Sequence, residues 1–270
     1  MRVIDLHCHI LPGIDDGPES IHESIRMAQA AVDAGTTTIA CTSHVHPRYP
    51  TPPGVIHEAV RDLQGRLDAL DVPLRVMPGG ELSLELLPRM SDADLDMACL
   101  GDGDWLLVEM PFQGWPLRLA ETLRDLEIRG YGVILAHPER AEAVQRTPDR
   151  MRDIMGRGPL VQVNAGSLTG EHGSGARRAA EALLRSGWVH FLASDAHSAG
   201  PWRPPGLGDG LDAAARVLRV EPDALRWMVE DGPRAVVEGR PVRPPRLTPS
   251  RTPRGDAGPA RDAPRAPSRG

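Results

Sequence analysis

Seven apolar segments, alternating with segments of helical periodicity, constrain the fold of this chain more than any other feature. The segments read RVIDL, TTTIACT, LRVMPG, DWLLVEM, YGVILA, LVQVN and VHFLAS, and each is long enough for one buried strand. Between the first two, apolar residues recur at helical spacing at Ile21, Ile25, Ala28 and Val32, behind a capping box of Ser20 and Glu23. Alternation of this kind over about 240 residues predicts an α/β fold with a parallel sheet, closed into a single-domain barrel. An open doubly wound sheet is the alternative.

The charge distribution separates the chain into two parts. The formal net charge is -6, but residues 241–270 contain seven Arg and two Asp, a balance of +5, so residues 1–240 carry -11. The same 30 residues include eight Pro and no aromatic residue, and they offer little apolar surface to bury. We therefore predict a folded domain over 1–240 and a disordered Pro/Arg-rich tail over 241–270.

Residues that are absent or rare exclude several classes of protein. No Lys occurs in the sequence, which excludes Schiff-base chemistry and a P-loop lysine. The three Cys are too few and too scattered for a disulfide framework, which favours a cytoplasmic protein. No apolar run has the length of a transmembrane segment. We expect no nucleic-acid partner, and the sequence leaves the oligomeric state, including a homo-oligomer, open.

Candidate metal ligands follow almost every predicted strand. Because the carboxyl ends of parallel strands meet on one face of a barrel, these residues are expected to become neighbours. Imidazole and carboxylate donors without a positioned thiolate suit Mn, Fe, Co or Zn, and several carboxylates favour more than one ion. In chain order the candidates are His7, His9, Asp15 and Asp16, then His44, Glu81, Glu109 and His137, and finally Asp195 and His197.

Two arginines follow the same strands as some of these candidates. Arg140 lies three residues beyond His137, and Arg203 lies six residues beyond His197. A planar guanidinium group beside clustered cations suits a phosphate, because the cations polarise its oxygens while Arg binds the others. The pattern therefore indicates phosphate chemistry, although a surface charge is the ordinary role of an Arg.

The motifs as a set resemble the polymerase and histidinol phosphatase (PHP) superfamily, and in particular its CpsB/CapC-type metal-dependent protein-tyrosine phosphatases. The resemblance covers residues 1 to about 240 and rests on DLHCHILPGIDDGP, TSH, PGGEL, LLVEMP, ILAHPER, VNAGSLTG and FLASDAH, in the family's order. It implies a distorted (β/α)7 barrel with a three-ion centre, usually of manganese.

The resemblance also implies a role for each site residue. It assigns Arg140 and Arg203 to the phosphate, with Arg203 in a loop whose length varies in the family. It leaves His46 outside the ligand set, because TSHVHP stands here where relatives often read TPHH. Asp15 is either a turn residue or a support for Asp16. The implied ligands are His7, His9, Glu81 and Asp195 for one ion, Glu81, Glu109 and His137 for a second, and Asp16, His44 and His197 for a third.

The activity implied is hydrolysis of phosphotyrosine by a metal-activated hydroxide, on a bacterial tyrosine kinase that controls capsule or exopolysaccharide synthesis. A cysteine-dependent phosphatase is excluded, because the position six residues after each Cys holds Ile14, Pro47 or Trp105 rather than Arg. The alternatives are another PHP phosphoesterase such as a histidinol phosphatase, an amidohydrolase, and a metal-bound protein that only sequesters phosphopeptides. The amidohydrolase is disfavoured because many amidohydrolases use a carbamylated lysine as a bridging metal ligand, and this chain contains no Lys. The sequence identifies no general acid.

Overall fold

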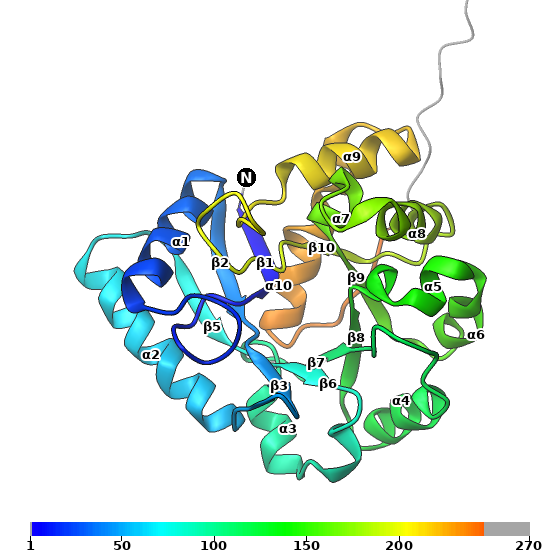
Figure 1. Cartoon of the computed structure of the whole chain (residues 1–270), viewed down its shortest axis with the longest axis horizontal. Helices are drawn as coiled ribbons and strands as arrows, with labels where there is room; N and C mark the ends of the chain where they lie inside the picture. Colours follow the sequence, from blue (N-terminus) through cyan, green and yellow to red (C-terminus); the bar gives the residue numbers. More distant parts are fainter. Residues whose placement is uncertain (1, 246–270) are drawn as a thin grey trace, which may run out of the picture.

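The structure, a computed structural model, describes residues 2–245 and shows strands surrounded by helices (Figure 1). Ten strands form within this range, in hydrogen-bonded orders β1-β2-β5 and β10-β9-β8-β7-β6-β3-β4. The predicted tail, residues 241–270, lies almost wholly outside the described residues. The strands are β1 (Val3–Cys8), β2 (Thr36–Cys41), β3 (His44–His46), β4 (Tyr49–Pro50), β5 (Arg75–Pro78), β6 (Glu81–Ser83), β7 (Trp105–Glu109), β8 (Gly132–Ala136), β9 (Leu160–Asn164) and β10 (Phe191–Ala193).

Two of the seven predicted strands are each followed, after two residues, by a further short strand that the sequence did not predict. Only Thr42 and Ser43 separate β2 from β3, and only Gly79 and Gly80 separate β5 from β6. The parallel pairing of β2 with β5 resumes as a parallel pairing of β3 with β6. Seven of the ten strands therefore lie in the seven predicted segments, whereas β3 and β6 lie beyond the predicted ends of two of them, and the remaining strand, β4, was also not predicted. That two-residue strand pairs antiparallel with β3, and it is too short to give a sequence pattern.

The barrel closes between its first and last strands. Cys8 forms a parallel bridge with Ala196, and the backbone N–H of Asp195 donates to the carbonyl of His7 at 2.8 Å. The N–H of His9 donates to the carbonyl of Ala196 at 2.9 Å. These bonds confirm the predicted distorted α/β barrel, and they place the ends of the first and last strands side by side.

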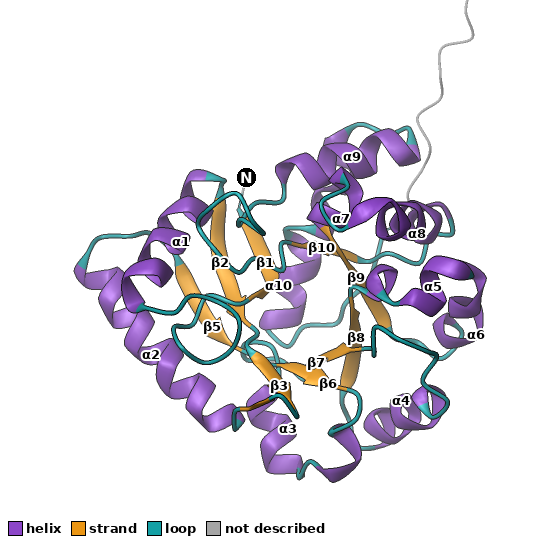
Figure 2. Ribbon diagram, viewed as in Figure 1, coloured by secondary structure: helices purple, strands orange, loops and turns teal. Residues whose placement is uncertain are grey.

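Helices cover the outside of the barrel, as Figure 2 shows. One bond of the predicted capping box is present, because the Ser20 hydroxyl accepts the N–H of Glu23, while the Glu23 carboxylate accepts the N–H of Glu19 rather than that of Ser20. The α-helices are α1 (Ile21–Asp33), α2 (Pro53–Ala69), α3 (Asp92–Ala98), α4 (Leu119–Ile128), α5 (Glu142–Arg146), α6 (Met151–Met155), α7 (Ala165–Thr169), α8 (Gly173–Arg185), α9 (Gly208–Leu218) and α10 (Asp231–Val237). None of these described helices has the length and apolar character needed to cross a membrane.

Two apolar clusters hold the barrel together. The larger packs the helices against the outside of the strands, and the smaller contains residues of β1, β2, β5, β7, β8, β9 and β10 together with Val236 and Val237 of α10. Helix α10 lies in the middle of the view in Figure 1. The carbonyl of Val237 accepts the N–H of Asp102, in the turn before β7, so α10 closes the amino-terminal end of the barrel. The carboxyl ends of the strands remain open for a site.

Candidate metal centre

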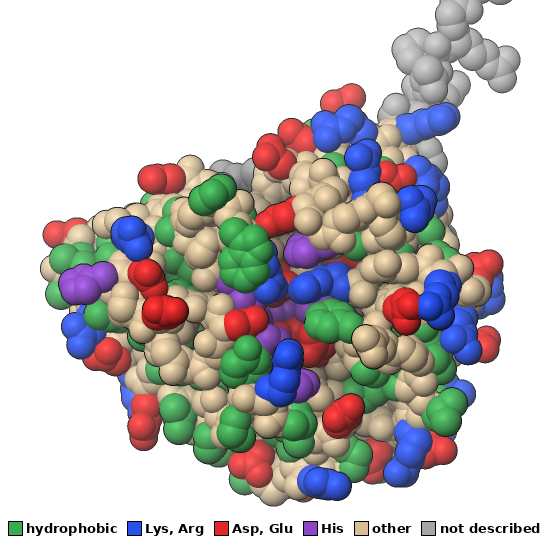
Figure 3. All heavy atoms as spheres, viewed as in Figure 1, with side chains coloured by type: hydrophobic (Ala, Val, Ile, Leu, Met, Phe, Trp, Pro, Cys, Tyr) green, Lys and Arg blue, Asp and Glu red, His purple; other side chains and the backbone are tan. Residues whose placement is uncertain are grey.

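The predicted ligand residues meet at the carboxyl ends of the strands. Figure 3 shows His, acidic and basic side chains gathered in a hollow at the middle of this face. Four groups of candidate ligands have donor atoms within 4.8 Å of one another, and together the groups contain all nine residues of the predicted ligand set. The groups are His9, Asp16, His44 and His197; His7, His9 and Asp195; His7, Glu81 and His137; and His44, Glu81 and Glu109.

Glu81, the first residue of β6, lies at the centre of the constellation. Its Oε1 lies 2.8 Å from Nε2 of His137 and 3.4 Å from Nε2 of His7. Its Oε2 lies 2.8 Å from Nδ1 of His44 and 3.4 Å from Nε2 of His9. A carboxylate with imidazoles on both oxygens has the geometry to bridge two cations.

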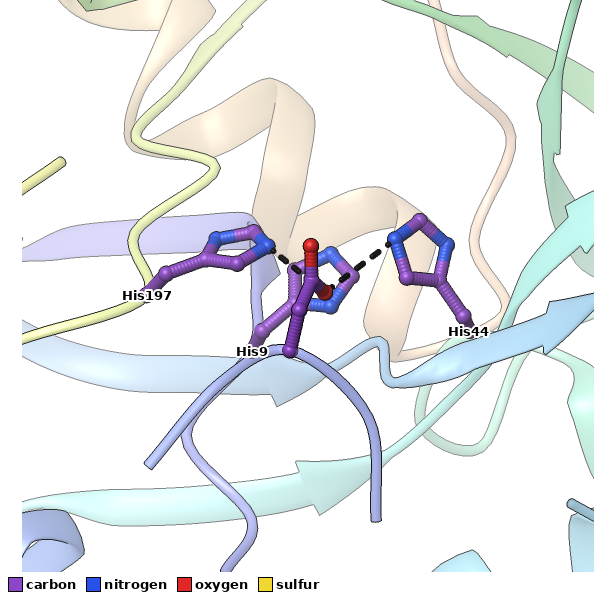
Figure 4. Close-up of side chains that lie close together, drawn as sticks. His9, His44 and His197 are labelled. Carbon is purple, nitrogen blue, oxygen red and sulfur yellow. Dashed lines mark ion pairs between the residues drawn. The ribbon is translucent and has the colours of Figure 1, made fainter. Parts of the chain in front are cut away.

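A second group lies toward the surface, around Asp16. His9, His44 and His197 point toward one another around a carboxylate in Figure 4. Oδ1 of Asp16 lies 3.2 Å from Nε2 of His197 and 3.5 Å from Nε2 of His44. The Asp16 side chain is more exposed than the other candidate ligands, so this group forms the solvent side of the centre.

Asp15 fixes the orientation of one of the histidines. Its Oδ2 lies 2.8 Å from Nδ1 of His9 and accepts the backbone N–H of His44 at 2.9 Å, while its Oδ1 accepts the N–H of Gly17. The bond to Nδ1 leaves Nε2 of His9 free to face the centre. The sequence left Asp15 as a turn residue or a support for Asp16; in the structure it contacts His9 and His44.

Two polar residues of β9 support the other side of the centre. Oε1 of Gln162 lies 3.0 Å from Nδ1 of His7, and Nε2 of Gln162 donates to Oδ1 of Asn164 at 2.8 Å. Nδ2 of Asn164 then donates to Oδ2 of Asp195 at 2.7 Å. Gln162 was missed by sequence reasoning, although the alternating polar residues in LVQVN were a signal that one face of this strand is not apolar.

The backbone is strained at several of these positions. Among the described non-glycine residues, five have a positive φ, and three of these are site residues: His137 at 29°, Asp195 at 52° and Arg203 at 48°. Such conformations persist only where the surrounding structure imposes them, and they concentrate at functional sites. The strained backbone is therefore an independent indication that the functional site lies on this face of the barrel.

The electrostatics of the cluster fit bound cations. Burial, together with the carboxylates of Glu81 and Asp195, raises the pKa of Glu109 to about 9. Burial lowers the pKa of His137 to about 4, so its imidazole is neutral and able to bind a metal. For Glu81, burial acts to raise the pKa, but His7 and His44 hold it well below its usual value. Acids crowded in this way gain stability from added positive charge.

Buried polar atoms without hydrogen bonds test more directly than the pKa values whether these residues suit bound cations. Four atoms that could bind a cation are buried and form no hydrogen bond of suitable geometry, although each lies close to a charged or imidazole group of the centre: Oε2 of Glu81, Oδ1 of Asp195, Nδ1 of His44 and Nε2 of His197. Leaving such atoms unpaired costs about 1–3 kcal/mol each, more for charged groups. Divalent cations would satisfy them, so the residues present fit the metals that the sequence predicts.

Both predicted arginines form ion pairs with the same carboxylate of the centre, that of Asp195. Nη1 of Arg140 lies 2.8 Å from Oδ2 of Asp195, and Nη2 of Arg203 lies 2.5 Å from Oδ1 of the same residue. The backbone of Arg203 is held at both ends, because its N–H donates to Oε1 of Glu171 and its carbonyl accepts the N–H of His197. No sequence pattern pointed to Glu171, which lies in the turn between α7 and α8.

The motif order, the barrel and the ligand geometry agree with one family. The family model described as capsular polysaccharide synthesis, CpsB/CapC, matches residues 3–237. The chain belongs to the CpsB/CapC family. A CpsB/CapC relative, the tyrosine-protein phosphatase YwqE of Bacillus subtilis, is 36% identical over 197 residues, which cover 73% of this chain and 78% of YwqE.

Solved structures extend the comparison to three dimensions. A crystal structure reported for YwqE from Bacillus subtilis and CpsB from Streptococcus pneumoniae, described as metal-dependent tyrosine phosphatases, superposes with a TM-score of 0.79 at 30% identity. The match covers 92% of this chain and 100% of that one. A histidinol phosphate phosphatase from Lactococcus lactis superposes with a TM-score of 0.53 at 13% identity, over 80% of this chain and 94% of that one. At this level of identity, the similarity to that phosphatase shows a common fold and nothing about function.

Proposed function

We propose that this CpsB/CapC family chain is a metal-dependent protein-tyrosine phosphatase, a phosphoric monoester hydrolase acting on phosphotyrosine. The observation that carries the proposal is the convergence of nine imidazole and carboxylate ligands with two guanidinium groups in one hollow. A cluster of divalent cations flanked by arginines is suited to a phosphoryl group and its developing charge. The names of the relatives, tyrosine-protein phosphatase and metal-dependent tyrosine phosphatase, support the phosphotyrosine assignment.

The ligand assignment follows the resemblance and the observed groups. His7, His9, Glu81 and Asp195 would hold one ion, Glu81, Glu109 and His137 a second, and Asp16, His44 and His197 a third. We propose manganese for this three-ion centre, with iron, cobalt or zinc as the alternatives that the donor set allows. When bound, the ions supply Lewis acidity toward the phosphoryl oxygens and a hydroxide nucleophile at neutral pH.

The protein's own groups bind and orient the substrate. Arg140 and Arg203 each present a guanidinium group beside Asp195, from which the free N–H donors of the fork can bind phosphoryl oxygens. The phenolate of tyrosine has a pKa near 10, so its departure needs less protonation than that of a serine alkoxide. A hydroxide supplied by bound ions would need no nucleophilic side chain from the protein, and the sequence and site suggest no general acid.

The one thiol at the centre is not suited to nucleophilic attack. Cys8 lies between His7 and His9 in the sequence but is fully buried. Burial, with Asp5 nearby, raises the pKa of its thiol well above the usual value, so the thiol stays protonated at neutral pH. Cys8 is therefore a packing residue between two ligands, as the sequence indicated.

The biological setting is also a proposal. A phosphotyrosine protein is the substrate expected for this activity, and the family description places relatives in capsular polysaccharide synthesis. We propose a cytoplasmic enzyme that acts on a bacterial tyrosine kinase controlling that pathway, with residues 1–240 as the catalytic domain and 241–270 as a tail.

The test combines metal analysis with phosphatase assays. Wild-type protein should contain manganese after loading and should release phosphate from a phosphotyrosine peptide faster than from histidinol phosphate. His7→Ala should lose metal and activity by more than about 100-fold, because it removes a buried ligand. His22→Ala, a change on the first turn of α1 outside every candidate group, is the matched control and should retain both. Equal activity in wild type and His7→Ala would overturn the proposal.

A further inference from the structure

Two exposed aromatic side chains stand at the edge of the metal centre. Phe112 lies in the loop between β7 and α4, and Trp202 lies in the loop between β10 and α9. Their exposed fractions are 40% and 59%, and they are the only aromatic residues among the exposed large hydrophobic side chains of residues 2–245. The whole sequence contains just two Phe, two Tyr and five Trp. Two of these nine rings are therefore partly exposed beside a highly charged site, where they bury little apolar surface and contribute little to the stability of the fold.

Each of the two rings contacts one candidate ligand and one arginine. The Phe112 ring centroid lies 5.9 Å from that of His137, and Cζ of Arg140 lies 4.9 Å from the Phe112 centroid. The Trp202 centroid lies 6.0 Å from that of His197, and Cζ of Arg203 lies 5.4 Å from the Trp202 centroid. Residues from two different loops thus repeat the same arrangement of imidazole, aromatic ring and guanidinium.

The rings also line the cavities beside the centre. Trp202 lines a cavity of about 590 Å³ that includes the candidate ligands Asp16 and His197. Phe112 lines a smaller cavity of about 220 Å³ with Arg140 and His172. Figure 3 shows hydrophobic side chains at the edge of the hollow that holds the charged groups. A group attached to a phosphate bound by both arginines would leave the hollow past one or both rings.

We propose that Phe112 and Trp202 form an aromatic rim that recognises the aryl group of the phosphorylated substrate. The inference rests on the proposed function, and it names the residues that give the site its preference for an aromatic phosphate ester. Aromatic rings attract one another in stacked or edge-to-face geometry by about 0.5–1.5 kcal/mol beyond the area they bury. That range corresponds to about three- to tenfold tighter binding per ring. An alkyl phosphate such as phosphoserine gains none of this contact.

Leaving-group chemistry offers a competing explanation for the same preference, because phenolate departs more readily than an alkoxide. Phosphonates separate the two explanations, since their carbon–phosphorus bond is not hydrolysed and only binding is measured. The experiment therefore compares phenylphosphonate with methylphosphonate by calorimetric titration of the manganese-loaded full-length chain.

Wild-type protein should bind phenylphosphonate about ten- to a hundredfold more tightly than methylphosphonate when both rings contact the phenyl group. The double variant Phe112→Ala/Trp202→Ala should bind the two phosphonates within about threefold of each other. Trp202→Phe, which keeps a ring, should retain most of the preference. Leu117→Ala is the matched control, because Leu117 is 92% exposed in the same loop as Phe112 and should leave the preference unchanged.

The outcomes distinguish this proposal from the proposed function. Equal binding of the two phosphonates by wild type, or a preference that survives in the double variant, overturns the aromatic rim while leaving the phosphate site intact. Weaker binding of both phosphonates by the double variant, by the same factor, would also overturn the aromatic rim, because the rings would then only support Arg140 and Arg203. A wild-type protein that binds neither phosphonate would contradict the phosphate site itself, and the rim with it.

Discussion

Replacing Glu81 by glutamine should remove most of the metal from the centre while leaving part of it. Glu81 belongs to two of the four candidate ligand groups, and its carboxylate lies within 3.4 Å of an imidazole nitrogen of four histidines. The group of His9, Asp16, His44 and His197 does not include it. If Glu81 bridges two of three ions, the Glu81→Gln protein should retain about one ion where the wild type binds three.

The expected size of the effect on stability follows from mass action. A ligand present at 100 times its Kd stabilises the native state by about 2.7 kcal/mol per site, so three sites give about 8 kcal/mol. For a domain of this size, each kcal/mol shifts Tm by about 2–4 °C. Manganese at that concentration should therefore raise the Tm of the wild type by about 15–30 °C, and that of Glu81→Gln by about 5–10 °C.

Thermal unfolding with and without a chelator measures this shift, and metal analysis of the same samples gives the stoichiometry. Each protein serves as its own metal-free reference, so any effect of the substitution on the metal-free fold cancels. Glu85→Gln is the matched control, because Glu85 is an exposed carboxylate four residues away that belongs to no candidate group. A Glu81→Gln protein with three ions and a wild-type shift would refute the bridging role.

Three further substitutions test positions around the site and in the fold. Glu171→Ala removes the acceptor for the N–H of Arg203, so KM for a phosphotyrosine peptide should rise about three- to tenfold, and Glu171→Gln should restore it. Burial lowers the pKa of His190 from 6.5 to about 4, so the unfolded chain binds this proton more readily and stability falls as the pH falls from 6.5 toward 4. His190→Asn, which offers an acceptor for the Val161 N–H, should reduce the loss measured by denaturant unfolding at pH 5 by about 2 kcal/mol. Gly210→Ala places a Cβ 2.5 Å from a carbon of α7, so it should cost about 1–3 kcal/mol and lower Tm.

Each of these three predictions has a result that would contradict it. A KM that stays unchanged in Glu171→Ala would mean that Arg203 keeps its position without the carboxylate. The His190 comparison is made without metal, so that protonation of the ligand histidines affects both proteins equally, and parallel pH profiles would contradict it. Gly65→Ala, in α2 with no atom within 4 Å of the added Cβ, should stabilise the protein by up to about 1 kcal/mol. Destabilisation by Gly65→Ala as large as that by Gly210→Ala would reject the steric explanation.

The residue types at the strand ends could be predicted from the sequence because one rule of parallel sheets applies to all of them. Six of the seven apolar runs have a His, Asp or Glu at or just beyond their carboxyl ends, and the carboxyl ends of parallel strands share one face. The rule can be applied without knowing in which direction each side chain points. It therefore brought together residues as distant as His9 and His197, whose ring centroids lie 4.1 Å apart in the structure.

The rule does not extend to which side chains face one another. The spacing of His7 and His9 places both side chains on one face, and their Nε2 atoms lie 3.1 Å apart, but it does not indicate which residues of the other strands face them. His137 and Asp195 adopt positive φ values that their residue types rarely take, and these depend on contacts from neighbouring strands. The sharing of Glu81 among four histidines could not be derived from spacing for the same reason.

The sequence by itself determined the order of the strands, the helices between them and the chemistry of the strand ends, because these depend on local periodicity and on parallel connection. The tertiary structure alone decided that Asp15 supports His9, that Glu171 holds Arg203 and that Phe112 and Trp202 flank the centre. The contacts of Glu171 with Arg203 and of Phe112 with His137 join segments far apart in the chain, whereas those of Asp15 with His9 and of Trp202 with His197 depend on how one loop folds back on itself. Loop conformation is set by packing against other elements rather than by a repeating pattern, so no local signal in the sequence specifies it.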